Sequence, residues 1–171
     1  VLAARRAGIP AVLHEQNVVP GRANRWLAAF ARAVAVSFPE TQSHLPAKVR
    51  VELTGNPIRV HPNGLSQEES CSLWGFNPAK PVLLIMGGSQ GSRAVNRLTL
   101  SMWANLSQAE REKIQVLHLA GSLDAAPVEA EYRRLNMEAR VFPFLNEMEK
   151  ALTAATLAVS RAGATGIAEM V

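Results

Sequence analysis

Two glycine-rich segments of this sequence combine residue types that can hold a phosphate and a sugar. The first, GGSQGSR, begins directly after the apolar run Val82–Met86, which predicts a strand buried on both faces. Backbone N–H groups in a tight turn from strand to helix point above the strand's carboxyl end, where the positive end of the helix dipole lies. We therefore predict that this turn binds phosphate. The residues concerned are Gly87, Gly88, Gln90 and Gly91, with the Ser89 hydroxyl placed to meet a phosphate oxygen.

The same turn departs from two common nucleotide-binding motifs. Ser92-Arg93 follows the last glycine, where a P-loop has Lys followed by Ser or Thr. The glycine spacing also differs from G-x-G-x-x-G, and the next predicted strand runs into Ala-Gly-Ser at 120–122 without an acidic residue for a ribose hydroxyl. These differences disfavour an ordinary NTPase or NAD site. A turn whose glycines serve backbone geometry alone is the alternative.

A second segment of the same kind, SRAGATG, runs from Ser160 to Gly166 between a predicted strand and a predicted helix. Glu169 follows in what we expect to be the first helical turn, and its carboxylate can accept hydrogen bonds from two neighbouring sugar hydroxyls. Alternatively, Glu169 only complements the helix dipole. Two such loops at the carboxyl ends of parallel strands favour a nucleotide lying across that edge.

Polar side chains also follow the short predicted strand Ala11–Leu13, where His14-Glu15-Gln16-Asn17 is expected to form a loop. This loop can bind polar groups of a substrate, and His14 and Glu15 are the candidates for a catalytic base within the chain. A satisfied surface loop is the alternative. Zinc binding is disfavoured because the i+4 histidine of a zinc-binding helix is missing, so we predict no metal site and no cofactor.

Strand and helix patterns alternate along the chain, which predicts an α/β fold with parallel, doubly wound sheets. The polar run His61–Gln67 is typical of a domain boundary, so we expect residues 1–60 and 61–171 to belong to two domains. Arg59, beside that boundary, can reach an anion, although solvated surface charge explains it equally well. Both ends of the sequence fall inside predicted elements, from which we expect a fragment. The predicted strands are Ala11–Leu13, Val34–Val36, Val49–Leu53, Val82–Met86, Gln115–Leu119, Arg140–Phe142 and Leu157–Ser160, and a helix is expected over Arg22–Ala33.

Composition narrows the classes of function. The chain has 171 residues, is 48% apolar and can bury a core, and it lacks both a membrane-spanning apolar run and the features of a signal peptide, so we expect it on the cytoplasmic side. Its net charge of +4 suits an anionic ligand or membrane surface. With three Trp, one Tyr and five Phe and no basic-aromatic pattern, nucleic acid is disfavoured. The single cysteine, Cys71, is expected to be structural.

Several motifs together resemble the MurG family, the undecaprenyldiphospho-muramoylpentapeptide N-acetylglucosaminyltransferases of bacterial cell-wall synthesis. In order, they are HEQN with PGRANRWLA, LTGNPIR, GGSQGSRAVN, FLNEM and SRAGATGIAE. The resemblance implies a GT-B fold of two Rossmann-like domains, with the later part of the first and the earlier part of the second present here. It also implies inverting transfer of N-acetylglucosamine from UDP-N-acetylglucosamine to the muramoyl sugar of an undecaprenyl-diphosphate-linked acceptor.

The resemblance further implies which residues meet the substrates. Asn17 would lie on the sugar-nucleotide or acceptor side, and Arg59 and Ser89 on the UDP-N-acetylglucosamine. The Leu145 backbone would meet the uracil, and ribose and diphosphate would lie against Ala164, Thr165, Gly166, Ile167, Ala168 and Glu169, with Glu169 on the ribose hydroxyls. The chain departs from the family pattern at Ala162, Thr165 and Gly166. The family's first Gly-rich loop, with its histidine, and its later glutamine segment are missing, so we expect the base outside this chain and no activity from the fragment alone.

A lipid-linked acceptor implies peripheral contact with the cytoplasmic face of the bacterial inner membrane. Arg5, Arg6, Arg22 and Arg25 can meet anionic headgroups, each contributing about 1 kcal/mol, although solvated helix faces explain these arginines equally well. Two other functions remain open from the sequence. One is another GT-B UDP-sugar transferase or an epimerase, and the other is a non-catalytic nucleotide-binding scaffold.

Overall fold

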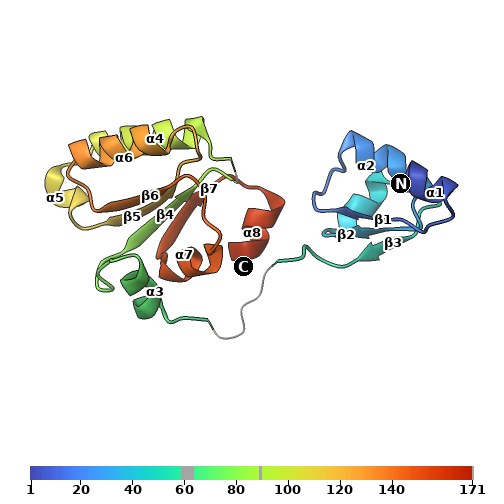
Figure 1. Cartoon of the computed structure of the whole chain (residues 1–171), viewed down its shortest axis with the longest axis horizontal. Coiled ribbons are helices and arrows are strands. Elements are labelled where there is room, and N and C mark those ends of the chain that lie inside the picture. The colour runs from blue at the N-terminus through green and yellow to red at the C-terminus, as the bar shows by residue number, and fades with distance from the viewer. Residues whose placement is uncertain (59–63, 89, 171) are drawn as a thin grey trace. The chain divides into compact units, whose positions relative to one another are not determined.

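The computed structural model describes residues 1–58, 64–88 and 90–170 (Figure 1). These residues form two compact units, one within residues 1–58 and one within residues 64–166, and each has its own parallel sheet and its own core. Arg59 and Ser89, both predicted to bind the sugar nucleotide, lie outside the described residues.

The first unit is a three-stranded parallel sheet in the order β1-β2-β3. Its core is small and centres on Val34 and Val36, which lie on alternate positions of β2 and are fully buried with Ala28 and Leu45. The elements are α1 (Leu2–Arg6), β1 (Val12–Glu15), α2 (Arg22–Leu27), the 3-10 turn η1 (Ala28–Phe30), β2 (Ala33–Val36), the 3-10 turn η2 (Pro39–His44) and β3 (Val51–Leu53).

Three sequence predictions for this unit were wrong in detail. The strand predicted over Val49–Leu53 begins only at Val51. His14 and Glu15 were expected in a loop, but they are the last two residues of β1, paired with Ala35 and Val36 of β2. Strand pairing with β2 therefore extends further than the short apolar run suggested. The helix predicted to reach Ala33 ends at Leu27, because the backbone becomes extended after η1 and Arg32 instead donates its N–H to the Ala11 carbonyl at 2.7 Å.

The second unit is a four-stranded parallel sheet in the order β6-β5-β4-β7. Strands β4, β5 and β7 coincide with the predicted ones, and the α/β, parallel-sheet fold class is confirmed. The elements are α3 (Gln67–Leu73), β4 (Val82–Met86), α4 (Arg93–Ala104), α5 (Gln108–Arg111), β5 (Gln115–Leu119), α6 (Ala125–Arg134), β6 (Ala139–Phe142), α7 (Met148–Ala154) and β7 (Leu157–Ser160). The last helix, α8 (Ala164–Met170), follows β7 and runs past residue 166, where this unit ends.

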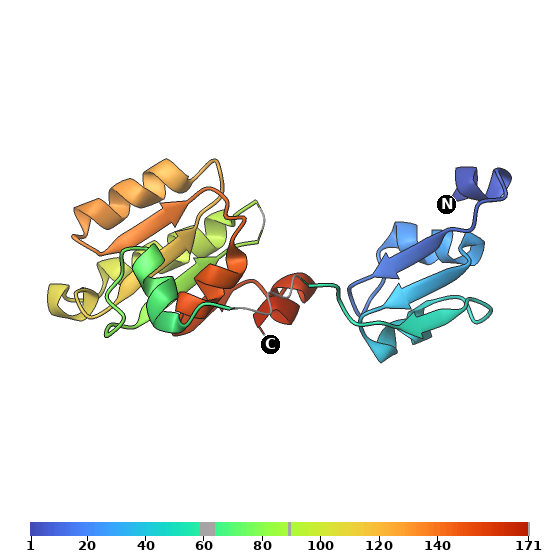
Figure 2. The same cartoon turned by 60° about the horizontal axis from the view of Figure 1, so that its bottom comes forward.

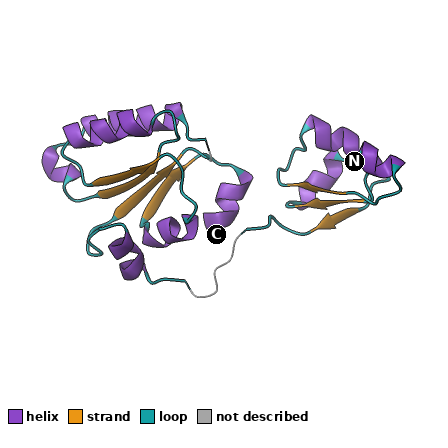
Figure 3. Cartoon of the chain, in the orientation of Figure 1, coloured by secondary structure: helices purple, strands orange, loops and turns teal. Residues whose placement is uncertain are grey.

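Helices cover both faces of this sheet (Figure 3). Alternate residues of β4 belong to two cores on opposite faces of the sheet. Leu83 and Ile85 pack with Trp103 of α4 and Tyr132 of α6. Val82, Leu84 and Met86 pack against α3 and α7. Figure 2 brings α3 and α7 in front of the sheet. Because both faces are covered, every residue of β4 and β5 is buried. Cys71 lies in the α3 and α7 core, and burial raises the pKa of its thiol, as expected of a structural cysteine.

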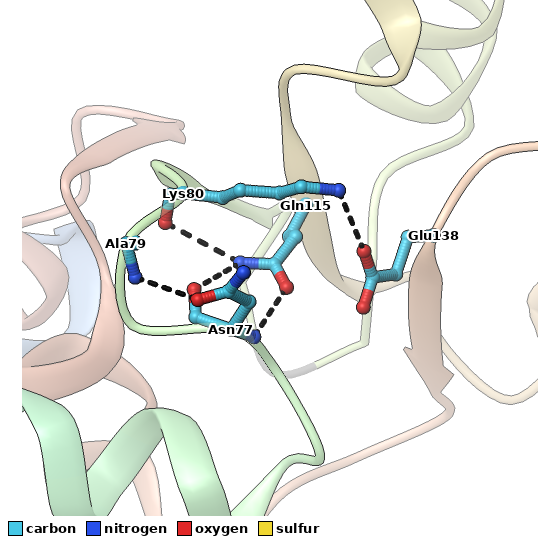
Figure 4. Close-up of polar contacts among 5 residues, drawn as sticks. All are labelled: Asn77, Ala79, Lys80, Gln115 and Glu138. Carbon is cyan, nitrogen blue, oxygen red and sulfur yellow. Dashed lines mark hydrogen bonds and ion pairs between the residues drawn. The ribbon is translucent and has the colours of Figure 1, made fainter.

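Gln115 fixes the amino edge of the second sheet (Figure 4). Its side chain is completely buried at the start of β5. Its Oε1 accepts the Asn77 N–H at 2.6 Å, and its Nε2 donates to the carbonyls of Asn77 and Lys80 at 2.9 and 3.3 Å. An ion pair between Lys80 and Glu138 lies beside it, with 3.6 Å between the charged atoms. These contacts anchor the turn before β4 and so set where β4 enters the sheet.

At the carboxyl edge, the turn after β4 and the turn after β5 touch through their backbones. Gly91 has φ +76°, and a Cβ there would lie 2.3 Å from the Ala120 carbonyl oxygen. Gly121 has φ +88°, and a Cβ there would lie 2.3 Å from the Gln90 carbonyl oxygen. Both positions therefore require glycine for two reasons: the backbone has a positive φ, and the neighbouring turn leaves no space for a Cβ atom.

Gly91→Ala should destabilise the second unit more than Gly88→Ala. Gly88 also has a positive φ, +97°, but nothing lies within 4 Å of a Cβ there, so its replacement costs only about 1–2 kcal/mol of backbone strain. The clash at Gly91 adds about 1–3 kcal/mol. Urea unfolding of both variants measures the difference, and equal losses would show that the two turns do not press on one another.

Candidate functional site

The carboxyl edge of the second sheet brings the two predicted loops together. β4 and β7 are neighbours, with Met86 paired to Ser160, so the turn that starts at Gly87 and the loop that starts at Arg161 leave the sheet side by side. The chain order also reverses at this pair of strands, because β5 and β6 lie on one side of β4 and β7 on the other. Open parallel sheets bind ligands at such a switch point.

The glycine turn after β4 leads directly into the start of α4. Gly88 and Gln90 are exposed at this edge, and the Gly91 N–H closes the turn by donating to the Gly88 carbonyl at 2.9 Å. α4 then begins at Arg93, with the Ser92 hydroxyl as its N-cap, accepting the Val95 N–H at 3.5 Å. The turn thus lies at the positive end of a three-turn helix.

The other residues predicted to meet the sugar nucleotide follow the carboxyl ends of β6 and β7. Leu145 follows β6, and its buried side chain packs in the core, which leaves only its backbone for a ligand. The residues from Ala164 to Glu169 all lie in α8, after β7. Glu169 is exposed and lies in the second turn of α8, so its expected place in the first turn was wrong. The helix dipole acts mainly within the first turn, which weakens the reading of Glu169 as a dipole partner.

In the first unit, the Glu15 carboxylate organises the residues after β1. It is 2% exposed and accepts four hydrogen bonds. Oε1 takes the backbone N–H and the side-chain amide of Asn17 at 3.0 and 3.1 Å, and Oε2 takes the Gly21 N–H at 3.1 Å and the Asn24 amide at 2.9 Å. Burial raises the pKa of this carboxyl, but the hydrogen bonds outweigh it, and the pKa lies below its ordinary value.

These hydrogen bonds indicate different roles for Glu15, Asn17 and His14. Glu15 stays ionised with both oxygens occupied, which favours a positioning role over that of the predicted base. Because the amide nitrogen of Asn17 is directed at Glu15, its Oδ1 points away and can accept a hydrogen bond from a ligand. Exposed His14 has its Nε2 3.2 Å from the Gly55 carbonyl oxygen. A carbonyl only accepts, so Nε2 carries the hydrogen and Nδ1 can take a proton.

Several supporting residues were missed in the sequence. Asn24 and Thr41 hold the segment after β1, Thr41 through its hydroxyl to the Asn17 carbonyl at 3.1 Å. Asp124 lies just past the stretch searched for an acidic residue after β5, and it binds Asn96 and Arg93 of α4 rather than facing outward. No sequence pattern marks such residues, because their partners come from distant elements.

Within residues 1–58, 64–88 and 90–170, no three His, Cys, Asp or Glu side chains gather as metal ligands. Among the helices of these same residues, none is long and apolar enough to cross a membrane.

Comparisons with known proteins agree with this architecture. The model of the glycosyltransferase family 28 C-terminal domain matches residues 82–171, and that of the glycosyltransferase family 28 N-terminal domain matches residues 1–36. A crystal structure of MurG from Acinetobacter baumannii matches with a TM-score of 0.62 and 32% identity, over 98% of this chain and 44% of that one.

Curated relatives carry one common name, UDP-N-acetylglucosamine--N-acetylmuramyl-(pentapeptide) pyrophosphoryl-undecaprenol N-acetylglucosamine transferase. The protein of Halothermothrix orenii is 36% identical over 99% of this chain and 47% of its own length. That of Thermodesulfovibrio yellowstonii is 38% identical over 99% of this chain and 46% of its own length. The chain thus spans about half the length of these relatives.

Glu15→Gln should destabilise the first unit by about 2–3 kcal/mol at pH 7. The NH2 group of the glutamine side chain would replace one carboxylate oxygen and face N–H groups that can only donate, so buried donors would be left without an acceptor. The Glu15 pKa is lower folded than its ordinary 4.5, so its contribution is present above that value and is lost as the pH falls below it. Chemical unfolding at pH 7 and pH 4 measures both effects.

Glu52→Gln is the matched control, because Glu52 makes one exposed ion pair with Arg50. It should cost less than about 1 kcal/mol. Equal losses in the two variants would contradict the organising role of Glu15.

Proposed function

Since the chain belongs to glycosyltransferase family 28, we propose that its complete gene product transfers N-acetylglucosamine from UDP-N-acetylglucosamine to an undecaprenyl-diphosphate-linked muramoyl-pentapeptide. The observation that carries this proposal is the pairing of the glycine turn after β4 with the loop after β7 at one sheet edge. The common name of the relatives supports the choice of substrates.

In this proposal the donor lies along the carboxyl edge of the second sheet. The diphosphate meets the N–H groups of the glycine turn and the start of α4, with the Ser89 hydroxyl on a phosphate oxygen. The uracil meets the Leu145 backbone after β6, two strands from β4, about 10 Å away at the usual strand spacing. Glu169 and the start of α8 take the ribose.

The reaction needs a base on the acceptor hydroxyl and stabilisation of the charge that grows on the leaving UDP. The oriented N–H groups of the turn and the dipole of α4 provide the second. Attack by the hydroxyl on the anomeric carbon breaks its bond to the diphosphate and inverts the configuration. On the acceptor side, Asn17 presents its Oδ1 to a hydroxyl, and the Nδ1 of His14 is the proton acceptor that this chain offers.

We also propose that the first unit meets the cytoplasmic face of an anionic membrane, where the lipid-linked acceptor resides. The arginines of α1 and α2 accompany exposed apolar side chains, with Trp26 61% and Leu2 40% exposed. The Arg5 guanidinium lies 5.6 Å from the centre of the Phe30 ring, and Trp26 packs edge-on against Phe30. Basic groups around exposed aromatic and aliphatic side chains suit the membrane interface.

Glu169→Ala should weaken binding of UDP-N-acetylglucosamine about tenfold, the effect of losing hydrogen bonds to a charged acceptor. The melting temperature should stay unchanged because the side chain is exposed. Isothermal titration of the complete gene product measures the affinity, and Glu129→Ala, an exposed position on α6, is the control.

The same titration separates the proposal from its alternatives. Equal affinity for UDP-N-acetylglucosamine and other UDP-sugars would favour a different UDP-sugar enzyme, and donor binding without turnover of the lipid acceptor would favour a scaffold. Unchanged donor affinity in Glu169→Ala would remove Glu169 from the site.

Reversing the charge of Arg5, Arg6, Arg22 and Arg25 should reduce binding to vesicles that contain phosphatidylglycerol by about a thousandfold, because four arginines at about 1 kcal/mol each contribute about 4 kcal/mol. Vesicle co-sedimentation measures this, with Arg133→Glu on α6 as the control. Unchanged binding by the fourfold variant would contradict the membrane surface.

A further inference from the structure

A fully buried polar cluster lies beneath the glycine turn, and the site described above does not use it. His118 of β5, Asn96 of α4 and Tyr132 of α6 are at most 2% exposed. The imidazole Nδ1 is 2.9 Å from the Tyr132 hydroxyl, and Nε2 is 3.0 Å from the Asn96 Oδ1. The three residues thus join the strand to both helices that cover this face of the sheet (Figure 1).

The partners of Asn96 fix the hydrogen positions in this cluster. Its amide nitrogen donates to the Ala120 carbonyl at 2.9 Å and to the Asp124 carboxylate at 3.0 Å, and neither group can donate in return. The Asn96 Oδ1 must therefore accept from His118, so the imidazole carries its hydrogen on Nε2. The Nδ1 then accepts the Tyr132 hydroxyl hydrogen. Burial lowers the pKa of His118 to about 4, which keeps this neutral form at pH 7.

Asn96 connects the cluster to the glycine turn. It lies in the first turn of α4, and the Ala120 carbonyl that it binds is the one pressed against Gly91. Arg93, at the start of α4, pairs with the Asp124 carboxylate at 3.4 Å. One oriented amide thereby holds the turn after β5 against the turn after β4.

We propose that His118 is a positioning residue for the nucleoside-diphosphate site: its Nε2–H fixes the Asn96 amide, which holds the Ala120–Gly121 turn against Gly91 and sets the backbone N–H groups that face the phosphates. The ligand class rests on the proposed function. His118 touches no substrate and acts through Asn96 alone. Tyr132 orients the imidazole from the far side and adds stability without setting the turn.

Two substitutions at His118 separate this role from simple core packing. In His118→Gln, the amide nitrogen takes the place of Nε2 and can still donate to Asn96. In His118→Asn, the shorter amide places its oxygen near Nδ1, which keeps the Tyr132 contact and loses the bond to Asn96. Both variants shrink the same buried side chain, so both should lower the melting temperature.

UDP affinity of the complete gene product, measured by titration calorimetry, gives the first readout. His118→Asn should lose about tenfold in affinity, the effect of one lost buried hydrogen bond, whereas His118→Gln should stay within about threefold. Tyr132→Phe, which leaves the Asn96 bond intact, should lose stability and keep its affinity. Affinity that falls in step with the melting temperature across all three variants would overturn the proposal.

Hydrogen exchange gives a second readout that needs no ligand. The Gly91 and Asp124 amides, bonded to the Gly88 and Gly121 carbonyls at 2.9 and 3.2 Å, should exchange faster in His118→Asn and at the wild-type rate in Tyr132→Phe. Unchanged exchange in His118→Asn overturns the positioning role whatever the ligand. If the amides exchange faster in His118→Asn but the wild-type protein does not bind UDP, the positioning role stands and only the proposed function is contradicted.

Discussion

The carboxyl edge of the second sheet depends on one close backbone contact, between Gly91 after β4 and the Ala120–Gly121 turn after β5. Neighbouring parallel strands bring their carboxyl ends to the same edge, but a side chain at either glycine would push the turns apart. With both glycines present, the start of α4 lies close to the sheet edge. Asn96 donates hydrogen bonds to the Ala120 carbonyl and the Asp124 carboxylate, and Arg93 pairs with Asp124, so α4 is bonded to the turn after β5. The geometry of this sheet edge is therefore a product of strand pairing and a buried polar cluster together.

In the first unit, a buried carboxylate fixes the segment that follows β1. Its polar residues after β1 have no glycine turn to shape them, and the buried Glu15 carboxylate gathers four donors around itself instead. A buried carboxylate is costly unless its hydrogen bonds are satisfied, and here they are. In both units, a buried polar group fixes a neighbouring amide: Glu15 accepts the Asn17 amide nitrogen, and the His118 Nε2 bonds the Asn96 Oδ1.

Part of the second unit could be predicted from sequence, because a strand covered on both faces has a continuous apolar sequence, as in Val82–Met86. The glycine-rich loops mark where β4 and β7 end, which is why the predicted phosphate turn and the loop before α8 could be located. The first unit was harder: β1 includes His14 and Glu15 because β2 pairs with them, and pairing partners leave no local signal. The His118 cluster was missed for the same reason, since its members are distant in sequence and each is an ordinary polar residue alone.

We infer that the carboxyl edge of the second sheet binds the UDP portion of the donor, and amide NMR of the chain during titration with UDP measures this binding residue by residue. Saturable shifts are expected at the amides of Gly88, Gln90, Gly91 and Leu145 and at the start of α8, with no change at the amino edge around Gln115. Saturable shifts confined to other surfaces, or none at millimolar UDP, would contradict it.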